Sequence, residues 1–539
     1  QRFSASGTED DLPRSYANAA TQLVAALARL GVAKPAPAPV FVDNAKDAAE
    51  FGAAVDAQNR HDAAQAADQL APLAKAHPDA ALLWSTLLGA QTEAKQDLPA
   101  EATRKEVLAH FVQADTLVTR TLRYVALDGQ GDDGAFKLLE QLVAQYPHDP
   151  QLAIAYAQAL AQNGARKRAI PVLERQVATD PQDANAYFLL GKYSIQQGNA
   201  QRAVDDYLLH ALVLRTRAGD AAGEAEVRNA LGIGYERLGQ LEAATEQYEK
   251  AVAMRDKLGD KRALATSLRN LAVVQAVQGD GAGAERSLDR AKGLLEALGD
   301  RASLADLYND RGVVHQEHGD FAAALGAYRE ALALRRQIDA PASIAESLDN
   351  VGLSYYRLGE FDNALAYWQQ ALGAYDKLED RPRKLRIEQH IGLLEIARGH
   401  FDVAHQGLDA ALRTAEDLQL PEEQAVTSTY LAELALAEGR HADALAAARR
   451  AGEIFTRGAD KHGVAEAQLL GVRTQLALGD AASAKASLAQ IAVDELGTEQ
   501  HAIALLAQAQ LALLEGDSAG AATKFAAARK LAEQAHAGV

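Results

Sequence analysis

Apolar residues in the middle of the chain recur three or four positions apart, a spacing that is typical of amphipathic helices. One such stripe precedes Gly239 and a second follows it. Their members are Val227, Leu231, Ile233 and Tyr235 before the glycine, and Leu241, Ala244, Tyr248 and Ala251 after it. The pattern therefore predicts two helices joined by a tight turn at Gly239.

This helix–turn–helix unit repeats along the chain. Glycine returns every 40 residues, at Gly239, Gly279, Gly319, Gly359, Gly399, Gly439 and Gly479. Alanine keeps the same step, at Ala244, Ala284, Ala324, Ala364, Ala404, Ala444 and Ala484. A period of this size predicts a solenoid, in which each unit buries its apolar face against its neighbours. We expect the glycine to end the first helix in a left-handed conformation, and the alanine to lie on the inner face of the second.

The order of small and aromatic residues within a unit is also regular. Gly232 and Tyr235 are followed by Ala244, Tyr248 and Ala251. The same order returns as Gly352, Tyr355, Ala364, Trp368 and Ala371. This order resembles the signature of the tetratricopeptide-repeat family.

The resemblance has two departures. The family's leading Trp is replaced by Leu268, Tyr308 and Leu348, and its closing Pro is missing from these units. The period of 40 exceeds the family's usual period of about 34, as in the variant repeats of kinesin light chain. The resemblance implies an all-α, right-handed superhelical solenoid that binds extended peptides or helices on the concave surface of its first helices. We expect about thirteen repeats.

The chain divides by pattern into five segments. Residues 1–34 hold one amphipathic helix, about Leu12 to Leu30, and residues 35–42 form a Pro/Ala linker. Residues 43–218 hold degenerate and 34-residue repeats, in which Ala135, Ala169 and Ala203 keep the step. Residues 219–495 hold the seven 40-residue repeats, and residues 496–539 the last repeat and a cap.

The N-terminal stretch resembles the segment that precedes repeats of this kind in some bacterial signalling proteins. Gln1 through Phe3, then Asp10 to Leu12 and an Ala/Leu helix, are similar to the end of a small β-containing domain. Such domains occur in membrane-linked Ser/Thr kinases, winged-helix regulators and cyclase-like proteins. The resemblance implies an output domain upstream of Gln1.

The net charge of -18 and the pI near 5.3 argue against nucleic acid and anionic membranes as partners. The absence of cysteine excludes disulfides and thiolate chemistry but fits either periplasm or cytoplasm. No apolar run reaches the length of a membrane span. We expect a periplasmic location, with the cytoplasm as the alternative.

Candidate ligand-binding residues lie two positions before the small residue of each first helix. They recur every 40 residues as Asn270, Asp310, Asn350, His390 and Tyr430. In related 40-residue repeats an asparagine at this place holds the backbone of an extended ligand. The same side chains could instead bond the neighbouring helix and hold the repeat geometry. Tyr356 and Arg357 are two further candidates for the groove, or ordinary surface residues.

Other motifs predict no chemistry. Arg381, Arg383, Lys384 and Arg386 form a basic cluster that indicates a solvated helix start, or an anchor for an acidic partner. The GxGxxG pattern of Gly129, Gly131 and Gly134 follows a helical stretch instead of a strand, so it indicates a loop. Two histidine pairs, His315 with His318 and His400 with His405, lack a third ligand at metal spacing. We therefore expect no metal, no cofactor and no enzymatic activity.

The sequence thus predicts a module that binds a protein or peptide in its groove. The more specific interpretation makes it the sensor region of a bacterial signalling protein. The alternatives are a constitutive assembly scaffold and a domain that positions a substrate for an enzyme on another chain.

Overall fold

The computed structural model describes residues 45–59, 62–94, 96–112, 117–128, 134–491, 496 and 498–534. These residues form helices and short turns, with no strand among them. The all-α prediction is therefore confirmed. The predicted helix at residues 12–30 and the linker at residues 35–42 lie outside the described residues.

The chain divides into two compact units, Gln1–Leu214 and Arg215–Val539. The helices of the first unit are α2 (Ala45–Asn59), α3 (Ala63–Ala76), α4 (Ala81–Glu93), α5 (Asp97–His110), α6 (Leu117–Asp128), α7 (Gly134–Gln145), α8 (Pro150–Gln162), α9 (Arg166–Thr179), α10 (Ala184–Gln196) and a last continuous helix made of α11 (Ala200–Arg202), the π-helical η2 (Ala203–Leu208) and α12 (Leu209–Ala218). The last of these, α12, runs across the boundary.

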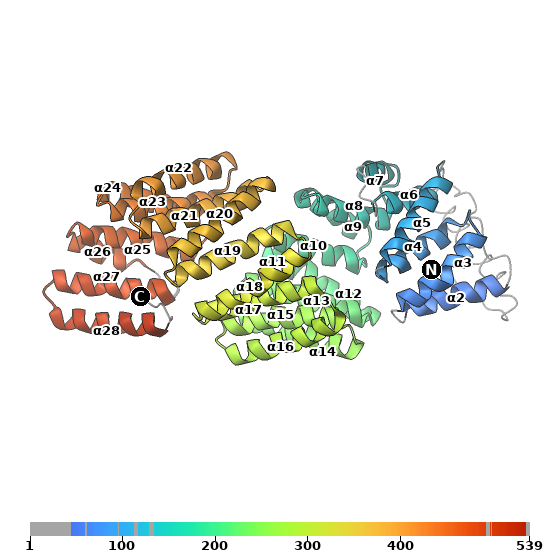
Figure 1. Cartoon of the computed structure of the whole chain (residues 1–539), viewed down its shortest axis with the longest axis horizontal. Coiled ribbons are helices and arrows are strands. Elements are labelled where there is room, and N and C mark those ends of the chain that lie inside the picture. The colour runs from blue at the N-terminus through green and yellow to red at the C-terminus, as the bar shows by residue number, and fades with distance from the viewer. Residues whose placement is uncertain are drawn as a thin grey trace. The chain divides into compact units, whose positions relative to one another are not determined.

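The second unit holds longer helices of more uniform length. They are α13 (Ala221–Arg237), α14 (Leu241–Leu258), α15 (Lys261–Val277), α16 (Gly281–Leu298), α17 (Arg301–Glu317), α18 (Phe321–Gln337), α19 (Pro341–Arg357), α20 (Phe361–Lys377), α21 (Arg381–Ala397), α22 (Phe401–Asp417), α23 (Pro421–Ala437), α24 (His441–Arg457), α25 (Lys461–Ala477), the short α26 (Ala481–Leu488), α27 (Thr498–Leu514) and α28 (Ser518–Gln534). Consecutive helices pack side by side in pairs (Figure 1), and with α11 to α12 taken as one helix the described residues hold thirteen such pairs.

The turn between the two helices of each 40-residue repeat is built as predicted. Its glycines, from Gly239 to Gly479, all have φ between 70° and 84°, in the left-handed region. A β-carbon opposes this conformation, so the glycines are there for the backbone angle. A β-carbon added at Gly239 or Gly359 would have no neighbour within 4 Å, so space is not the constraint.

A second left-handed position lies halfway between these glycines, where one repeat ends and the next begins. It is Gly219, Gly259 and Gly299 in the first copies, with φ of 69°, 74° and 64°. In later copies it is Asp339, Glu379, Gln419 and Ala459, with φ of 50° to 57°. These later copies therefore hold a side chain where the backbone favours glycine.

Replacing Ala459 by glycine should stabilise the protein by about 0.5 kcal/mol, because relief of backbone strain exceeds the entropy that glycine adds to the unfolded chain. The reverse change, Gly299→Ala, should destabilise it by about 1 kcal/mol. Urea titrations followed by circular dichroism would measure both. If Ala459→Gly lowers stability, the strain assigned to this turn is absent.

The core lies between the two helices of each repeat and the first helix of the next. The predicted inner alanines, from Ala244 to Ala484, are all 0% exposed. Large side chains four residues later lie against a glycine in the first helix. A β-carbon on Gly232 would come within 2.4 Å of the Tyr248 ring, and one on Gly352 within 2.6 Å of Trp368. The glycine of the first helix therefore leaves the space into which the aromatic side chain of the second helix packs.

Candidate functional site

The first helices of the second unit line its inner side. Every first helix from α13 to α27 contacts the first helix of the following repeat or of the preceding one. Among the described helices, no two second helices come as close to each other. In a curved stack, the elements on the concave side are the ones that crowd together. The concave wall is therefore made of first helices, where the sequence places the candidate residues.

Two of the candidate residues are held by asparagines of the preceding repeat. Asn350 donates from Nδ2 to Oδ1 of Asn309 at 2.8 Å, and Asn270 donates to Oδ1 of Asn229 at 3.3 Å. In both pairs the two residues are 41 positions apart. All four amides are half-buried, and each pair leaves part of its hydrogen-bonding capacity unused.

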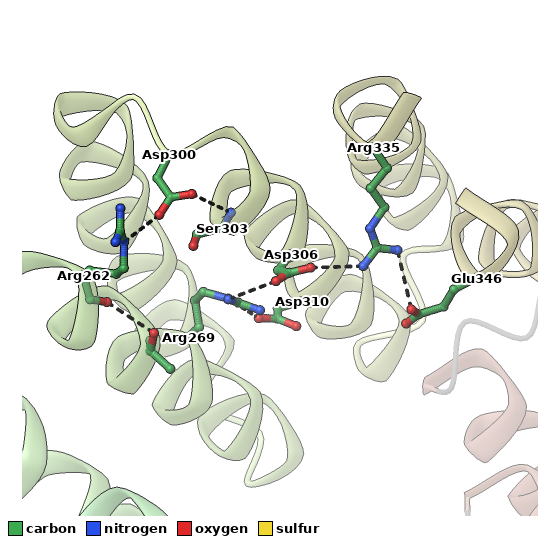
Figure 2. Close-up of polar contacts among 9 residues, drawn as sticks. Arg262, Arg269, Asp300, Ser303, Asp306, Asp310, Arg335 and Glu346 are labelled. Carbon is green, nitrogen blue, oxygen red and sulfur yellow. Dashed lines mark hydrogen bonds and ion pairs between the residues drawn. The ribbon is translucent and has the colours of Figure 1, made fainter. Parts of the chain in front are cut away.

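Two more candidates belong to charged pairs with the same 41-residue spacing. Arg269 donates from Nε to Oδ2 of Asp310 at 2.6 Å and lies 3.7 Å from Asp306 (Figure 2). Burial raises the pKa of Asp310, although the Arg269 guanidinium opposes this shift. His390 Nδ1 lies 3.0 Å from Oδ1 of Asp349. Amide and charged pairs thus alternate along the wall, and we call the four pairs the inner ladder.

Asp349 is the most connected residue of the inner ladder. It is 5% exposed, and its Oδ1 accepts a hydrogen bond from Trp368 Nε1 at 3.0 Å as well as meeting His390. Arg386 lies 3.4 Å from its second oxygen. Burial alone would raise the pKa of Asp349, but His390, Arg386 and the Trp368 N–H together hold it below the usual value of 3.8. The ionised Asp349 carboxylate therefore stabilises the folded state in full at pH values above 3.8, the usual pKa. This stabilisation is lost as the pH falls through the lowered pKa of the folded state.

Two buried arginines repeat the alternation on the second helices. Arg255, 8% exposed, donates to Ser267 Oγ at 2.6 Å, and Arg335, 4% exposed, donates to Ser347 Oγ at 2.8 Å. Arg335 also bridges Asp306, at 3.2 Å, to Glu346, at 3.8 Å (Figure 2). In the single repeat between them the corresponding residues are apolar, Leu295 and Leu307. Two repeats after Arg335 the position is Ala415, so the buried arginines follow the alternation only as far as Arg335.

The other three candidates lie outside the inner ladder. Tyr356 packs with Phe361 and Trp368, with ring centroids 5.6 and 5.8 Å apart. The Arg357 guanidinium lies 4.9 Å from the centroid of the Phe321 ring. Tyr430 packs against the cluster of Ala404, Leu408 and Leu434, and burial raises its pKa to about 12.

The inner ladder stops at Tyr430. The residue that would pair with it, Gln389, bonds Thr427 Oγ1 at 2.9 Å and Glu423 at 3.0 Å instead. An aromatic ring therefore takes the place of the fifth pair.

A row of half-buried aliphatic residues runs beside the inner ladder; the sequence analysis named Ile233 of this row as part of an apolar stripe, but did not identify the row itself. It lies three residues after the candidate positions, on the same helix face. Its members are Ile233, Val273, Val313, Leu353 and Leu393. The next two positions are Glu433 and Arg473, which form an ion pair. We call the five aliphatic residues the apolar row; the 40-residue step was the signal that could have revealed it.

The remaining motifs have partners within the chain. Each residue of the basic cluster has an acidic neighbour, such as Asp417 at 3.9 Å from Arg381 and Asp380 at 3.4 Å from Arg383. The four histidines of the two pairs contact nearby residues, as His315 does Glu285. Gly129 and Gly131 lie outside the described residues. Among the described side chains, none are grouped so as to hold a metal ion, and no described helix has the length and apolarity to cross a membrane.

These features define a class: an α-helical solenoid whose inner wall carries a polar ladder and an apolar row. Tetratricopeptide-repeat family models match residues 133–193, 166–222, 225–260, 263–337 and 343–417. The chain belongs to the tetratricopeptide-repeat family. The predicted family is thus confirmed; repeats of this family are protein–protein interaction modules and are generally non-catalytic.

Solved structures with similar repeats include BtubC (BKLC) from P. vanneervenii and MamA. The BtubC match has 23% identity and a TM-score of 0.34, and covers 43% of this chain and 92% of that one. The MamA match has 21% identity and a TM-score of 0.28, and covers 33% of this chain and 96% of that one. Among curated protein sequences, none matches.

Proposed function

We propose that the second unit binds a segment of another protein, as an extended peptide or a helix, along its concave wall. The observation that carries this proposal is the apolar row beside the inner ladder. The row offers one half-buried aliphatic side chain per repeat, and the amides beside it retain hydrogen-bonding capacity. Apolar anchors flanked by backbone-binding groups are what a peptide groove requires.

The spacing of the apolar row suggests the form of the ligand. Neighbouring helices pack about 8–10 Å apart. Apolar residues three apart on an extended peptide, or seven apart on a helix, are separated by about 10 Å. A ligand with apolar residues at either spacing would meet every member of the row.

The double variant Asn270→Ala with Asn350→Ala tests the predicted contact residues. We expect about a tenfold loss of affinity for peptides selected from a displayed random library, because their backbones lose two hydrogen bonds. Isothermal titration measures this loss. The control is Asn229→Ala with Asn309→Ala, which removes the same two contacts between repeats from the partner side. It also removes the hydrogen bond that Asn229 Oδ1 accepts from Ser267 Oγ at 2.8 Å, so its melting temperature is measured alongside. Equal losses of affinity in both doubles would mean that the amides act only through repeat geometry.

The more specific proposal is that this module is the sensor region of a bacterial signalling protein, with an output domain upstream of Gln1 and a periplasmic location. The inner ladder favours it, because a ligand that changes the angle at one pair would change the pitch over several repeats. The alternatives are a constitutive scaffold and a cytoplasmic location. Small-angle scattering with and without a selected peptide separates sensor from scaffold, since only the sensor requires a change in radius of gyration.

A further inference from the structure

A third set of side chains lies on three of the first helices, one helical turn before the inner ladder, whereas the apolar row lies one turn after it. Its members come four residues before the candidate positions and therefore point to the same side of each helix. In α17, α19 and α21 they are Asp306, Glu346 and Arg386, and we call these three residues the charged row. Their side chains are 49%, 48% and 44% exposed, so a ligand in the groove would meet their charged ends.

The contacts of the charged row place it on the concave wall. Asp306 lies 3.7 Å from Arg269 of the preceding first helix (Figure 2). Arg386 lies 3.4 Å from Asp349 of the preceding first helix, at the same spacing in the sequence. Both partners are members of the inner ladder. The charged row therefore borders the ladder.

The charged row changes sign between α19 and α21, and the buried charges beneath it change sign as well. Asp306 and Glu346 lie 3.2 and 3.8 Å from Arg335, whose side chain is only 5% exposed (Figure 2). Arg386 pairs with Asp349, whose side chain is 7% exposed. The acids are thus the outer members of their ion pairs in α17 and α19, and the base is the outer member in α21.

The outer member of each ion pair determines what a ligand meets first. A ligand side chain comes closer to a half-exposed charge than to the buried charge behind it, and the Coulomb energy falls with distance. Asp306 and Glu346 therefore favour a basic side chain, although Arg335 contacts both of them. Arg386 favours an acidic one, although Asp349 pairs with it.

The charged row has uncharged residues at both ends. At the same position α15 carries Thr266 and α23 carries Val426. On the same three helices as the charged row, the apolar row consists of Val313, Leu353 and Leu393. A ligand bound to these three aliphatic residues would therefore meet two acids and then one base.

We propose that the charged row selects segments of partner proteins that carry two basic residues and then an acidic one, and that it sets the register of the bound segment. This inference rests on the binding along the concave wall proposed above. The three charges would be spaced like the apolar residues of the ligand, about three apart in an extended peptide or about seven apart in a helix. A shift by one repeat would bring a base to Arg386 or an acid to Glu346, and like charges in contact oppose binding.

Two displayed peptide libraries test the charge order. One has leucine at every third residue and the other at every seventh, with random residues elsewhere, and both are selected against the full chain. We expect enriched peptides to carry base, base and acid at the leucine spacing, in this order or its reverse. If no enriched peptide loses binding in the Leu353→Asp and Val313→Asp variants, the proposed binding along the concave wall is wrong. If enriched peptides do lose binding there but show no such charge order, only the present inference is overturned.

A double-mutant cycle with the tightest peptide tests the contact with Arg386. Arg386→Gln and a neutral amide in place of the peptide's acid should each weaken binding about fivefold, and both together should cost little more than either one. Isothermal titration measures the four affinities. The matched control, Arg413→Gln, removes an exposed arginine of the second helix α22 and should leave binding unchanged.

Two results of this experiment would overturn the proposal. Additive losses in the cycle would show that Arg386 does not meet the acid of the ligand. A dimer of the full chain that Arg386→Gln dissociates, detected by sedimentation, would assign the charged row to a second copy of the chain.

Discussion

Replacing Trp368 by alanine is expected to lower the free energy of unfolding of the second unit by about 4 kcal/mol. The indole is 1% exposed, packs over Gly352 and is surrounded by Tyr356 and His390. Alanine would leave a cavity that neighbouring helices cannot close, and would remove the hydrogen bond to Asp349 at 3.0 Å. The carboxylate would then lose one of the groups that hold its pKa low.

The loss should be local and should have a graded control. Hydrogen exchange should increase in α19, α20 and α21, because a solenoid repeat contacts only its neighbours. Trp368→Phe keeps most of the packing and should cost about half as much. Trp84, in the first unit, donates to the carbonyl of Pro78 at 2.9 Å and remains in the variant as a fluorescent reporter. Unchanged protection around α20 would show that Trp368 is not a support of this core.

A glycine-to-alanine change should have opposite signs at two helical positions of the second unit. At Gly232 the new β-carbon would lie 2.4 to 2.7 Å from three atoms of the Tyr248 ring, which is 0% exposed and cannot move aside. We expect Gly232→Ala to destabilise by about 2 kcal/mol, because overpacking outweighs the gain in helix propensity. At Gly293, inside α16, nothing lies within 4 Å of the new β-carbon. Gly293→Ala should stabilise by about 1 kcal/mol.

Thermal and urea unfolding of the two variants measure the pair directly. Because the substitution and the helical setting are the same, the difference between them isolates the contact with Tyr248. A companion change, Tyr248→Leu in the Gly232→Ala background, should recover part of the loss, since leucine leaves room where the ring lay. If the Gly232→Ala variant is as stable as the unaltered protein, the Tyr248 ring is not tightly packed against Gly232.

The repeat architecture could be predicted because its causes are local. Left-handed turns at Gly239 and its equivalents follow from the cost of a β-carbon, and the buried alanines from helix periodicity. The second left-handed position was missed where Glu379 and Ala459 replace glycine, although Gly219, Gly259 and Gly299 gave the signal. The π-helical turn at Ala203–Leu208 left no pattern in the sequence that we can identify.

The candidate site could be predicted only as a set of positions. The 40-residue step identified Asn270, Asn350 and their equivalents, but not which groups they meet. Their partners lie 41 residues away, because the contact joins neighbouring positions on two successive helices. This 41-residue spacing depends on the rotation of one repeat relative to the next. That rotation cannot be predicted from the sequence of a single repeat. Whether these amides bind a ligand stays a prediction.

The alternation of amide and charged pairs determines how many repeats can be added by duplication, or removed by deletion, without breaking a pair. Excision of residues 241–320, two adjacent repeats, would bring Asn229 opposite Asn350 and restore an amide pair. Excision of residues 261–300, one repeat, would bring Asn229 opposite Asp310 and leave that half-buried acid without Arg269. The same cut would leave Arg255 facing Leu307 in place of Ser267. The sequence repeats every 40 residues, but the polar contacts of the inner ladder repeat only every two repeats, so two repeats form the unit that can be duplicated or deleted intact.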